Sequence, residues 1–385
     1  MASAKKKKST WAKKKAALKK KKRALAVKAY PAFRKLPVRK KKIFFESFSN
    51  RRFNDNPKAI YDELCRRHAP YKMIWALADA SIDVGPQGKA VEHKSFGYWY
   101  HLATSKYIVS NFNQMSSVKR KGQVFVQTMH GTPLKHMGLS VTKTDWKIKR
   151  MKQMFSHDWD YFVTPSDYFC DILTGPSYRF GGTFLKVGYP RNDYLVNNKD
   201  NLALINEVRF KLDIPAGKKV ILYAPTWRTK KSFDLKLDLK RLEEALSDEY
   251  VLVIRAHYLE EKYLDKSIYN DFVINGHGYK DVNEMLIAAD VLITDYSSIM
   301  FDYTILMKPM ILFTWDYERY VENTRGTYFD LKSEYPKLLA MTNDDVLDRF
   351  ESLDEVMEDI EAFHARFNQY ETGHAAQSVV DAVFE

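Results

Sequence analysis

The sequence predicts an α/β protein with two domains, each built on a parallel sheet covered by helices. The chain has 385 residues, which is too long for one ordinary α/β unit and suits two. Short apolar runs alternate with helical patterns in two successive series, with a pause between residues 190 and 217. Four of the apolar runs end abruptly in polar residues, which indicates ligand binding at the carboxyl ends of parallel strands.

The first predicted domain covers residues 43–200. Runs rich in β-branched and aromatic residues predict its strands, at 43–48, 71–76, 107–110, 124–128 and 160–164. We expect a helix capped by Asn56, because Pro57 suits a first helical turn. The aromatic stretch 95–103 is predicted to be helical, and the segment 165–167 is typical of another helix start.

The second predicted domain covers residues 201–385 and begins with a helix near 200–212. Its strands are predicted at 219–223, 251–254, 272–274, 291–294 and 310–313. A long helix at 344–367 and a further helix near the C-terminus complete it. Strands and helices that alternate in this way predict parallel sheets with helices on both faces.

The net charge of +14 is concentrated in a Lys-rich arm, residues 1–42, which contains 19 Lys and Arg and no Asp or Glu. The remaining residues carry 43 basic and 48 acidic side chains. A disordered tail, a nucleic-acid contact and an anionic membrane contact are the alternatives. We favour the membrane and expect no nucleic acid, because the body has no basic face or binding motif. Clustered Lys and Arg contribute on the order of 1 kcal/mol each near acidic lipid.

Several classes of protein are excluded by composition. No stretch approaches the 18 or so apolar residues of a membrane span, and the N-terminus has no apolar signal-peptide core. Only Cys65 and Cys170 are present, so a disulfide scaffold is not expected and a reducing cytosol suits the chain. CxxC, HExxH and Walker-type motifs are absent, which argues against structural zinc and P-loop chemistry.

The strand predicted at 124–128 leads to a histidine. His130 is followed by Gly131, which permits a tight turn, and by Thr132-Pro133, which could start a helix. A neutral imidazole at the rim of the sheet can accept a proton from an attacking hydroxyl. A hydrogen bond within the turn is the alternative role for His130.

Three strand ends of the second domain also carry polar groups. Thr226, Trp227 and Arg228 offer a hydroxyl, a ring and a fork of donors, although Trp227 could equally lie in the core. Arg255 and His257 lie two apart, so they would share a face and suit an anionic substrate. A strand-end arginine paired with a carboxylate is the simpler alternative.

The third strand end is Asp295-Tyr296-Ser297-Ser298, which leads into an amphipathic helix at 299–303. Ser297 or Ser298 would be its N-cap, and a helix N-terminus with hydroxyls suits a phosphate. An ordinary capped helix is the alternative. A later loop, 325–327, contains Gly326, which would permit a ligand or another segment to lie close to the backbone.

Two Rossmann-like domains that face each other across a cleft make the architecture of a GT-B glycosyltransferase, with the nucleotide donor on the C-terminal domain. Six motifs then occur in order and carry a family resemblance. They are Asn56–Ala59, His130–Lys135, Gly188–Asp193, Tyr223–Arg228, Arg255–Tyr258 and Asp295–Ser298. Over roughly residues 43–385 the chain resembles the CDP-glycerol glycerophosphotransferase family of teichoic acid synthesis in Gram-positive bacteria.

The resemblance implies a GT-B fold and transfer of glycerol phosphate from CDP-glycerol to an undecaprenyl-diphosphate-linked saccharide, with release of CMP. It implies no cofactor, and no metal site is evident. His130 would be the general base, and His257 would stabilise charge on the phosphate. The remaining candidates fall into two sets. Donor or phosphate ligands would be Thr226, Arg228, Arg255, Asp295, Ser297 and Ser298; cleft residues would be Gly131, Arg191, Arg325, Gly326 and Thr327. Asp295 and Arg191 could instead be structural.

The acceptor of this family implies a peripheral enzyme at the cytoplasmic face of the membrane, which agrees with the basic arm. A short chain with one catalytic unit resembles primases, which add one or a few units, more than the larger polymerases. A CDP-ribitol donor and a polymerising or capsule-building relative remain alternatives. A different class, a polyanion-binding protein acting through its arm, is the last alternative.

Overall fold

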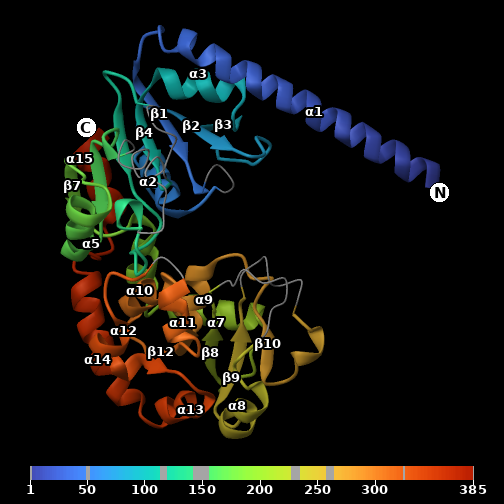
Figure 1. Ribbon diagram of the computed structural model, residues 1–385, viewed down its shortest axis with the longest axis vertical. Helices are drawn as coiled ribbons and strands as arrows, with labels where there is room; N and C mark the ends of the chain where they lie inside the picture. Colours follow the sequence, from blue (N-terminus) through green and yellow to red (C-terminus); the bar gives the residue numbers. More distant parts are fainter. Residues whose placement is uncertain are drawn as a thin grey trace.

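The structure is a computed structural model that describes residues 2–48, 53–112, 119–141, 156–226, 235–256, 264–323 and 326–384. Two sheets lie one above the other, each with helices packed on its faces (Figure 1). Every strand pair in the described residues is parallel. The predicted α/β class with two Rossmann-like domains is therefore confirmed.

The first sheet has seven strands in the order β3-β2-β1-β4-β5-β6-β7. Its strands are β1 (Arg39–Glu46), β2 (Lys72–Leu77), β3 (Gly88–Glu92), β4 (Ser105–Ser110), β5 (Val124–Gln127), β6 (Tyr161–Thr164) and β7 (Thr183–Lys186). Its helices include α2 (Asp55–Arg66), α3 (Phe96–Thr104) and α5 (Asp167–Ile172). The sequence did not predict β3 and β7, which are the two edge strands and carry fewer buried residues than the central ones.

Asn56 does not cap helix α2, contrary to the prediction. The N-cap is Asn54, and Asn56 lies in the first turn with a fully buried side chain. Its amide donates to the carbonyl oxygens of Thr128 and Met129, at 3.2 and 3.0 Å. The Asn56 side chain therefore holds the segment that follows β5. It does not bond to the backbone N–H groups at the start of α2.

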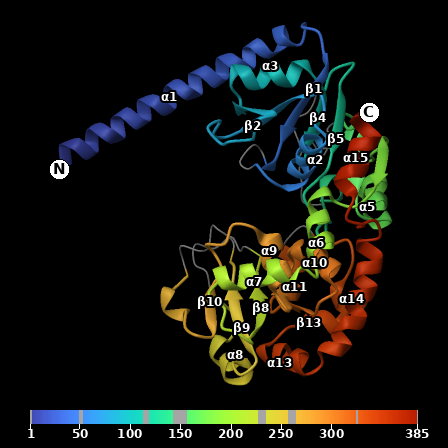
Figure 2. The ribbon, with the colours of Figure 1, turned by 180° about the vertical axis from the view of Figure 1, so that it is seen from behind.

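Helix α1 (Ala2–Phe33) contains most of the Lys-rich arm and extends away from the first domain (Figures 1 and 2). Its last turns pack on α3: Ala26 is fully buried, and the Tyr30 ring lies 4.8 Å from that of Trp99. Arg23 also forms an ion pair with Glu92 of β3, at 3.0 Å. The C-terminal third of α1 is thus part of the first domain's packing, and β1 starts at Arg39, before the predicted residue 43.

The second sheet has six strands in the order β10-β9-β8-β11-β12-β13. They are β8 (Lys219–Tyr223), β9 (Tyr250–Ile254), β10 (Val273–Asn275), β11 (Val291–Thr294), β12 (Met310–Phe313) and β13 (Leu339–Ala340). The helices are α6 (Asp193–Asn198), α7 (Leu202–Lys211), α8 (Leu239–Leu246), α9 (Val282–Ala288), α10 (Ile299–Tyr303), α11 (Tyr317–Asn323), α12 (Leu331–Glu334), α13 (Asn343–Glu351) and α14 (Leu353–Phe367). The predicted helix 344–367 is therefore two helices, α13 and α14, with a break at Ser352.

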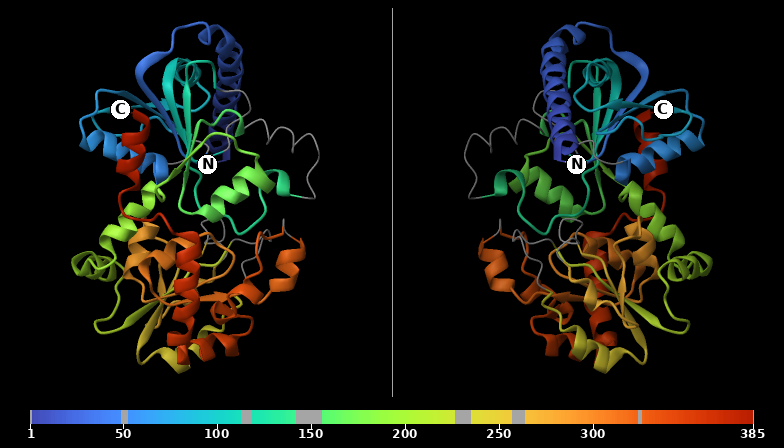
Figure 3. Two further views of the ribbon diagram at one scale, coloured as in Figure 1. Left: turned by 90° about the vertical axis from the view of Figure 1, so that its left-hand side faces the viewer. Right: turned by 90° about the vertical axis from the view of Figure 1, so that its right-hand side faces the viewer.

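The C-terminal helix α15 (Ala375–Phe384) returns to the first domain (Figure 3, red). It packs against α2, and Val379, Val380 and Phe384 join the core of the first sheet. The chain therefore crosses between the domains twice, once before α6 and once before α15. Among the residues that the structure describes, no helix is long and apolar enough to cross a membrane.

Candidate active site

The carboxyl ends of the two sheets meet at Gly131 and Ser298. Gly131 follows β5 of the first sheet, and Ser298 precedes α10 after β11 of the second. A Cβ atom on Gly131 would lie 3.0 Å from both Cβ and Oγ of Ser298, and Gly131 has a φ of +152°. Because a side chain at this position would be strained and crowded, glycine is what permits the two domains to approach here.

His130 lies at this junction with an exposed side chain. Its Nδ1 atom is 2.9 Å from the carbonyl oxygen of Asn111, at the end of β4. A carbonyl can only accept, so Nδ1 carries a proton, and a ring with its single proton there presents the Nε2 lone pair. The Phe48 ring lies 5.4 Å away, centroid to centroid, on one side of the imidazole. The sequence-predicted residue is thus held in the tautomer that can accept a proton at Nε2.

The helix expected at Thr132-Pro133 does not form. The segment after it pairs instead with a loop of the second domain, through a bridge between Lys135 and Thr327. Gly326 accepts a backbone hydrogen bond from His136 at 3.0 Å. A Cβ atom on Gly326 would meet the His136 ring at 3.0 Å, and its φ is +77°. Gly326 and Thr327 therefore lie beside the chain that follows His130.

Asp295 is buried at the end of β11 and joins neighbouring strand ends. Its Oδ1 atom accepts from the backbone N–H of Thr226 at 2.8 Å and of Tyr296 at 2.7 Å. These bonds place the backbone of Thr226, at the end of β8, next to the start of the serine-containing turn. The structure thus gives Asp295 a role in holding the strand ends together.

Ser297 and Ser298 precede α10, as predicted. Ser298 is exposed and stands at the N-cap, with no side-chain capping bond to a described residue. Ser297 is half-buried, and its hydroxyl oxygen accepts from the backbone N–H of Ile299 at 3.4 Å. The hydroxyl of Ser298 thus faces the junction with Gly131.

Arg255, at the end of β9, is directed at a neighbouring loop. Its Nη1 atom donates to the carbonyl oxygens of Tyr279 at 2.6 Å and Gly276 at 3.4 Å. Arg228, His257 and Arg325 lie outside the described residues, and so does Trp227. Their predicted roles therefore stay predictions.

Arg191, predicted as a cleft residue that could instead be structural, belongs to a short 3-10 turn, η4 (Pro190–Asn192), where the chain first crosses between the domains. Its Nη1 atom contacts Asp55 of the first domain at 3.1 Å, and its Nη2 atom contacts both Asp302 oxygens of the second domain at 2.7 Å. Burial works to lower the pKa of Arg191, but the charges of Asp302 and Asp55 hold it above its ordinary value. Asp302 had one sequence signal: it is a carboxylate on a short, otherwise apolar helix.

Glu371, between α14 and α15, lies under the same turn. It accepts from the backbone N–H of Tyr189 at 3.1 Å and from the Asn192 amide at 2.9 Å. Burial raises the pKa of Glu371 to about 8, although these donors work to lower it. In the part of the chain that the structure describes, no group of three His, Cys, Asp or Glu side chains could hold a metal ion.

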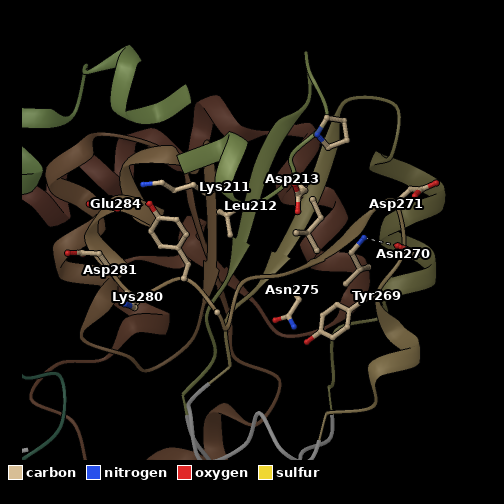
Figure 4. A pocket seen from close by; sticks show the side chains of 15 residues that line it. Lys211, Leu212, Asp213, Tyr269, Asn270, Asp271, Asn275, Lys280, Asp281 and Glu284 are labelled. Atoms are coloured by element: carbon tan, nitrogen blue, oxygen red, sulfur yellow. Dashed lines mark hydrogen bonds between the residues drawn. The ribbon is translucent and has the colours of Figure 1, made fainter. Parts of the chain in front are cut away.

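A separate pocket of about 1030 Å³ lies at the β10 edge of the second sheet (Figure 4). It is lined by Lys211, Leu212, Asp213, Pro215, Tyr269, Asn270, Asp271, Val273, Ile274, Asn275, Gly278, Tyr279, Lys280, Asp281 and Glu284. These described residues include none of the sequence-predicted site residues. The junction between His130 and Ser298 is therefore the candidate active site.

The chain is similar to known proteins over most of its length. The teichoic acid poly(glycerol phosphate) polymerase of Staphylococcus epidermidis is 35% identical over 370 residues, which are 90% of this chain and 51% of that protein. The teichoic acid glycerol-phosphate transferase of Staphylococcus aureus is 32% identical over 371 residues, 91% of this chain and 94% of that protein. A solved structure of the wall teichoic acid polymerase TagF is 33% identical, with a TM-score of 0.84 over 98% of this chain and 96% of that chain.

The lengths of these relatives differ. The chain spans about half the length of the Staphylococcus epidermidis polymerase. It spans 92% of a Bacillus spizizenii poly(glycerol phosphate) polymerase, at 32% identity, and 89% of a Bacillus subtilis glycerol-phosphate primase, at 29% identity. Relatives of about this length therefore include both primases and polymerases.

The family comparison covers most of the chain. Residues 28–385 match the family described as CDP-glycerol:poly(glycerophosphate) glycerophosphotransferase. The match begins before residue 43, where the sequence resemblance was expected to start, because the end of α1 and the start of β1 belong to the folded body. The chain therefore belongs to the CDP-glycerol:poly(glycerophosphate) glycerophosphotransferase family of teichoic acid synthesis.

Proposed function

We propose that the protein transfers glycerol phosphate from CDP-glycerol to a hydroxyl of an undecaprenyl-diphosphate-linked saccharide and releases CMP. The observation that carries the proposal is the hydrogen bond from Nδ1 of His130 to the Asn111 carbonyl, which presents Nε2 as a proton acceptor at the junction of the two domains. Family membership supports the donor, and structures of a TagF variant with CDPG support it further.

In the proposed reaction the acceptor hydroxyl oxygen attacks the phosphorus that carries glycerol. A new P–O bond forms, the bond to the CMP oxygen breaks with its electron pair, and the hydroxyl proton passes to Nε2 of His130. Ser297, Ser298, Thr226 and Arg228 would hold the diphosphate, and His257 would stabilise the charge on the transferring group. Such a reaction needs positioning and charge stabilisation, without a nucleophilic side chain.

The number of glycerol phosphate units added is a separate question. The expectation of a primase depended on chain length, and length does not distinguish primases from polymerases among the relatives described above. Product size on a defined acceptor distinguishes them: a primase adds one or a few units, and a polymerase gives a ladder.

Release of CMP tests the proposal. We expect release from CDP-glycerol only when a lipid-linked disaccharide, or a soluble analogue of it, is present. A panel with CDP-ribitol and nucleotide sugars in place of CDP-glycerol serves as the specificity control. Faster turnover of CDP-ribitol, or no turnover of any CDP-alditol, would contradict the proposal.

We also propose that helix α1 binds an anionic membrane surface at the cytoplasmic face. Beyond the ion pairs of Lys19 and Arg23 with Glu92, the helix extends away from the domain (Figures 1 and 2). Lys20, Lys21 and Lys22 are exposed. These cations are suited to acidic lipid and to a peripheral enzyme whose acceptor is lipid-linked.

The membrane contact is tested by deleting residues 2–18. This deletion keeps Lys19, Arg23 and Ala26, which pack on the first domain; removal of all of residues 1–42 would destroy part of β1. We expect at least tenfold weaker association with vesicles containing acidic phospholipid and unchanged turnover of a soluble acceptor. Unchanged vesicle association would contradict the proposal, and loss of salt-sensitive nucleic-acid binding alone would favour the polyanion-binding alternative.

A further inference from the structure

All three nitrogens of the Arg191 guanidinium donate to acceptors within the protein. Nη2 donates to both oxygens of Asp302, and Nη1 donates to Asp55 and to the carbonyl oxygen of His130, the latter at 2.8 Å. Nε donates to the Asn192 side chain at 3.2 Å. All three guanidinium nitrogens thus have acceptors within the protein, which directs the group at protein atoms.

On the side of the first domain, the contacts of Arg191 hold His130 from two directions. Nη1 binds the His130 carbonyl directly. It also binds Asp55, whose other oxygen accepts from the Asn111 amide at 2.9 Å. Asn111 in turn accepts the Nδ1 proton of His130 through its backbone carbonyl. The backbone and the ring of His130 are therefore tied to the same arginine.

Asp55 carries a sign of strain at this point. It has a φ of +67°, which is uncommon for a residue with a side chain. Such a conformation is unfavourable and persists where the surrounding contacts fix it. This backbone conformation places the Asp55 carboxylate between Asn111 and Arg191. One oxygen accepts from Asn111 and the other from Arg191.

On the side of the second domain, Arg191 binds α10. Asp302 lies in this helix, one turn after Ser298, and both of its carboxylate oxygens contact Nη2 of Arg191. Both side chains are largely buried, with 14% and 12% exposed. A charge-assisted contact of this kind is short and strong, and burial of both partners holds it in place. The position of α10, and of the serines before it, is thus coupled to the position of His130.

We infer that Arg191 is a positioning residue for the reaction: with Asp55 and Asp302 it sets the distance between His130 and the serine end of α10. The inference rests on the proposed function, because it assigns proton transfer to His130. A misplacement of about 1 Å between reacting groups can lower a rate by about 10²-fold. The network is therefore expected to act on turnover more than on binding of the donor.

The test is Arg191→Lys, which keeps the charge but cannot meet Asp302 and the His130 carbonyl at once. We expect kcat for CMP release to fall by about 10²-fold, with the Kd of CDP-glycerol within about threefold of wild type. The matched control is Arg209→Lys, an arginine paired with Asp290 at 2.8 Å elsewhere in the second domain, which should keep kcat. Wild-type kcat in Arg191→Lys, or loss of donor binding in proportion to kcat, would overturn the inference.

A second variant covers the case in which Arg191→Lys does not fold. Asp302→Asn keeps one acceptor oxygen and the shape of the side chain, and we expect about a tenfold loss of kcat with the donor Kd unchanged. If Asp302 had a purely structural role, Asp302→Asn would have a lower melting temperature but the kcat, and the pH profile of kcat, of wild type. That result would contradict the inference.

A readout without substrate separates this inference from the proposed function. In wild type, the ¹⁵N chemical shifts of the His130 ring should show protonation at Nδ1, with His130→Asn used to assign the signal. We expect folded Arg191→Lys to lose this preference. Retention of the Nδ1 tautomer would count against the inference, whereas absence of CMP release by wild type would count against the proposed function alone.

Discussion

His130 of the first domain is held at its ring by Asn111 and at its carbonyl by Arg191, whereas Ser297 and Ser298 of the second domain begin a short helix with few bonds to their hydroxyls. In the second domain, the carboxylate of Asp295 accepts from the backbone N–H groups of Thr226 and Tyr296. The difference suits the proposed chemistry. A base needs one fixed direction for its lone pair, while a phosphate site needs donors that are not already engaged.

The largest expected effect is on His130. His130→Asn keeps a side chain that can donate to the Asn111 carbonyl but has no basic nitrogen, so we expect kcat to fall by about 10³-fold with the CDP-glycerol Kd unchanged. His68→Asn, on the first domain near Gln87, is the control and should keep wild-type turnover. Full activity of His130→Asn would remove the contrast between the two sides of the site.

Gly131→Ala tests whether the two sides must touch. The new methyl group would meet Ser298 at 3.0 Å, and φ is +152°, so we expect the domains to be forced apart locally and kcat to fall by about 10²-fold. Gly122→Ala is a matched control, because Gly122 also has positive φ, +90°, but no heavy atom of the described residues lies within 4 Å of the added Cβ. Equal losses of activity in both variants would show that backbone strain, not the contact with Ser298, is responsible.

Asp295→Ala tests the structural role on the second-domain side. The N–H groups of Thr226 and Tyr296 would lose their buried acceptor, which should lower the free energy of unfolding by about 2 kcal/mol in denaturant titrations. Asp295→Asn keeps an acceptor oxygen and should retain most of the stability. A tenfold weaker CDP-glycerol Kd in a fully stable Asp295→Asn would instead place this carboxylate in the donor site.

An effect on the pH dependence of stability, and not on turnover, is expected at Glu371, under the turn that joins the domains. Its pKa is raised from 4.5 to about 8 by burial, so the folded protein binds a proton that the unfolded chain releases. The stabilising contribution of Glu371 is complete below about pH 4.5 and is lost as the pH rises through about 8. We expect Glu371→Gln to remove this loss when the free energy of unfolding is measured from about pH 5 to about pH 9.

The control for that titration is Glu358→Gln, a mostly exposed carboxylate on α14 paired with Lys337. It should leave the pH dependence of stability unchanged. A Glu371→Gln protein with the wild-type pH dependence would show that Glu371 stays ionised and held by its donors.

Much of the fold could be predicted because central strands are continuous apolar runs. The bounds of β8, β11 and β12 agree with the prediction to the residue, since these strands are buried on both faces. The edge strands β3 and β7 were missed, because partial burial leaves no apolar run to detect. The strand β13 was missed because two residues are too few to form such a run. Ser352, which divides α13 from α14, interrupts the helical pattern too briefly to be recognised.

Some residues of the candidate site could be predicted from the sequence, and others could not. His130, Ser297 and Ser298 were predictable from their places after apolar runs, because a strand end fixes where the next residues lie. The partners of Arg191 were not, because Asp55 and Asp302 lie more than 100 residues away from it on opposite sides along the chain. The position of Glu371 depends on the return of the chain to the first domain at α15. No local sequence pattern predicts that return.

The sequence by itself determined the two parallel sheets, the strand ends that carry polar residues and the family to which those residues belong. Local periodicity and residue type are sufficient for these, because they depend on neighbours along the chain. Only the tertiary structure decided which strand ends meet, that Gly131 lies against Ser298, and that Arg191 joins the base to α10. Those contacts form between segments distant in sequence, so they exist only after both domains and the returning C-terminal helix have packed.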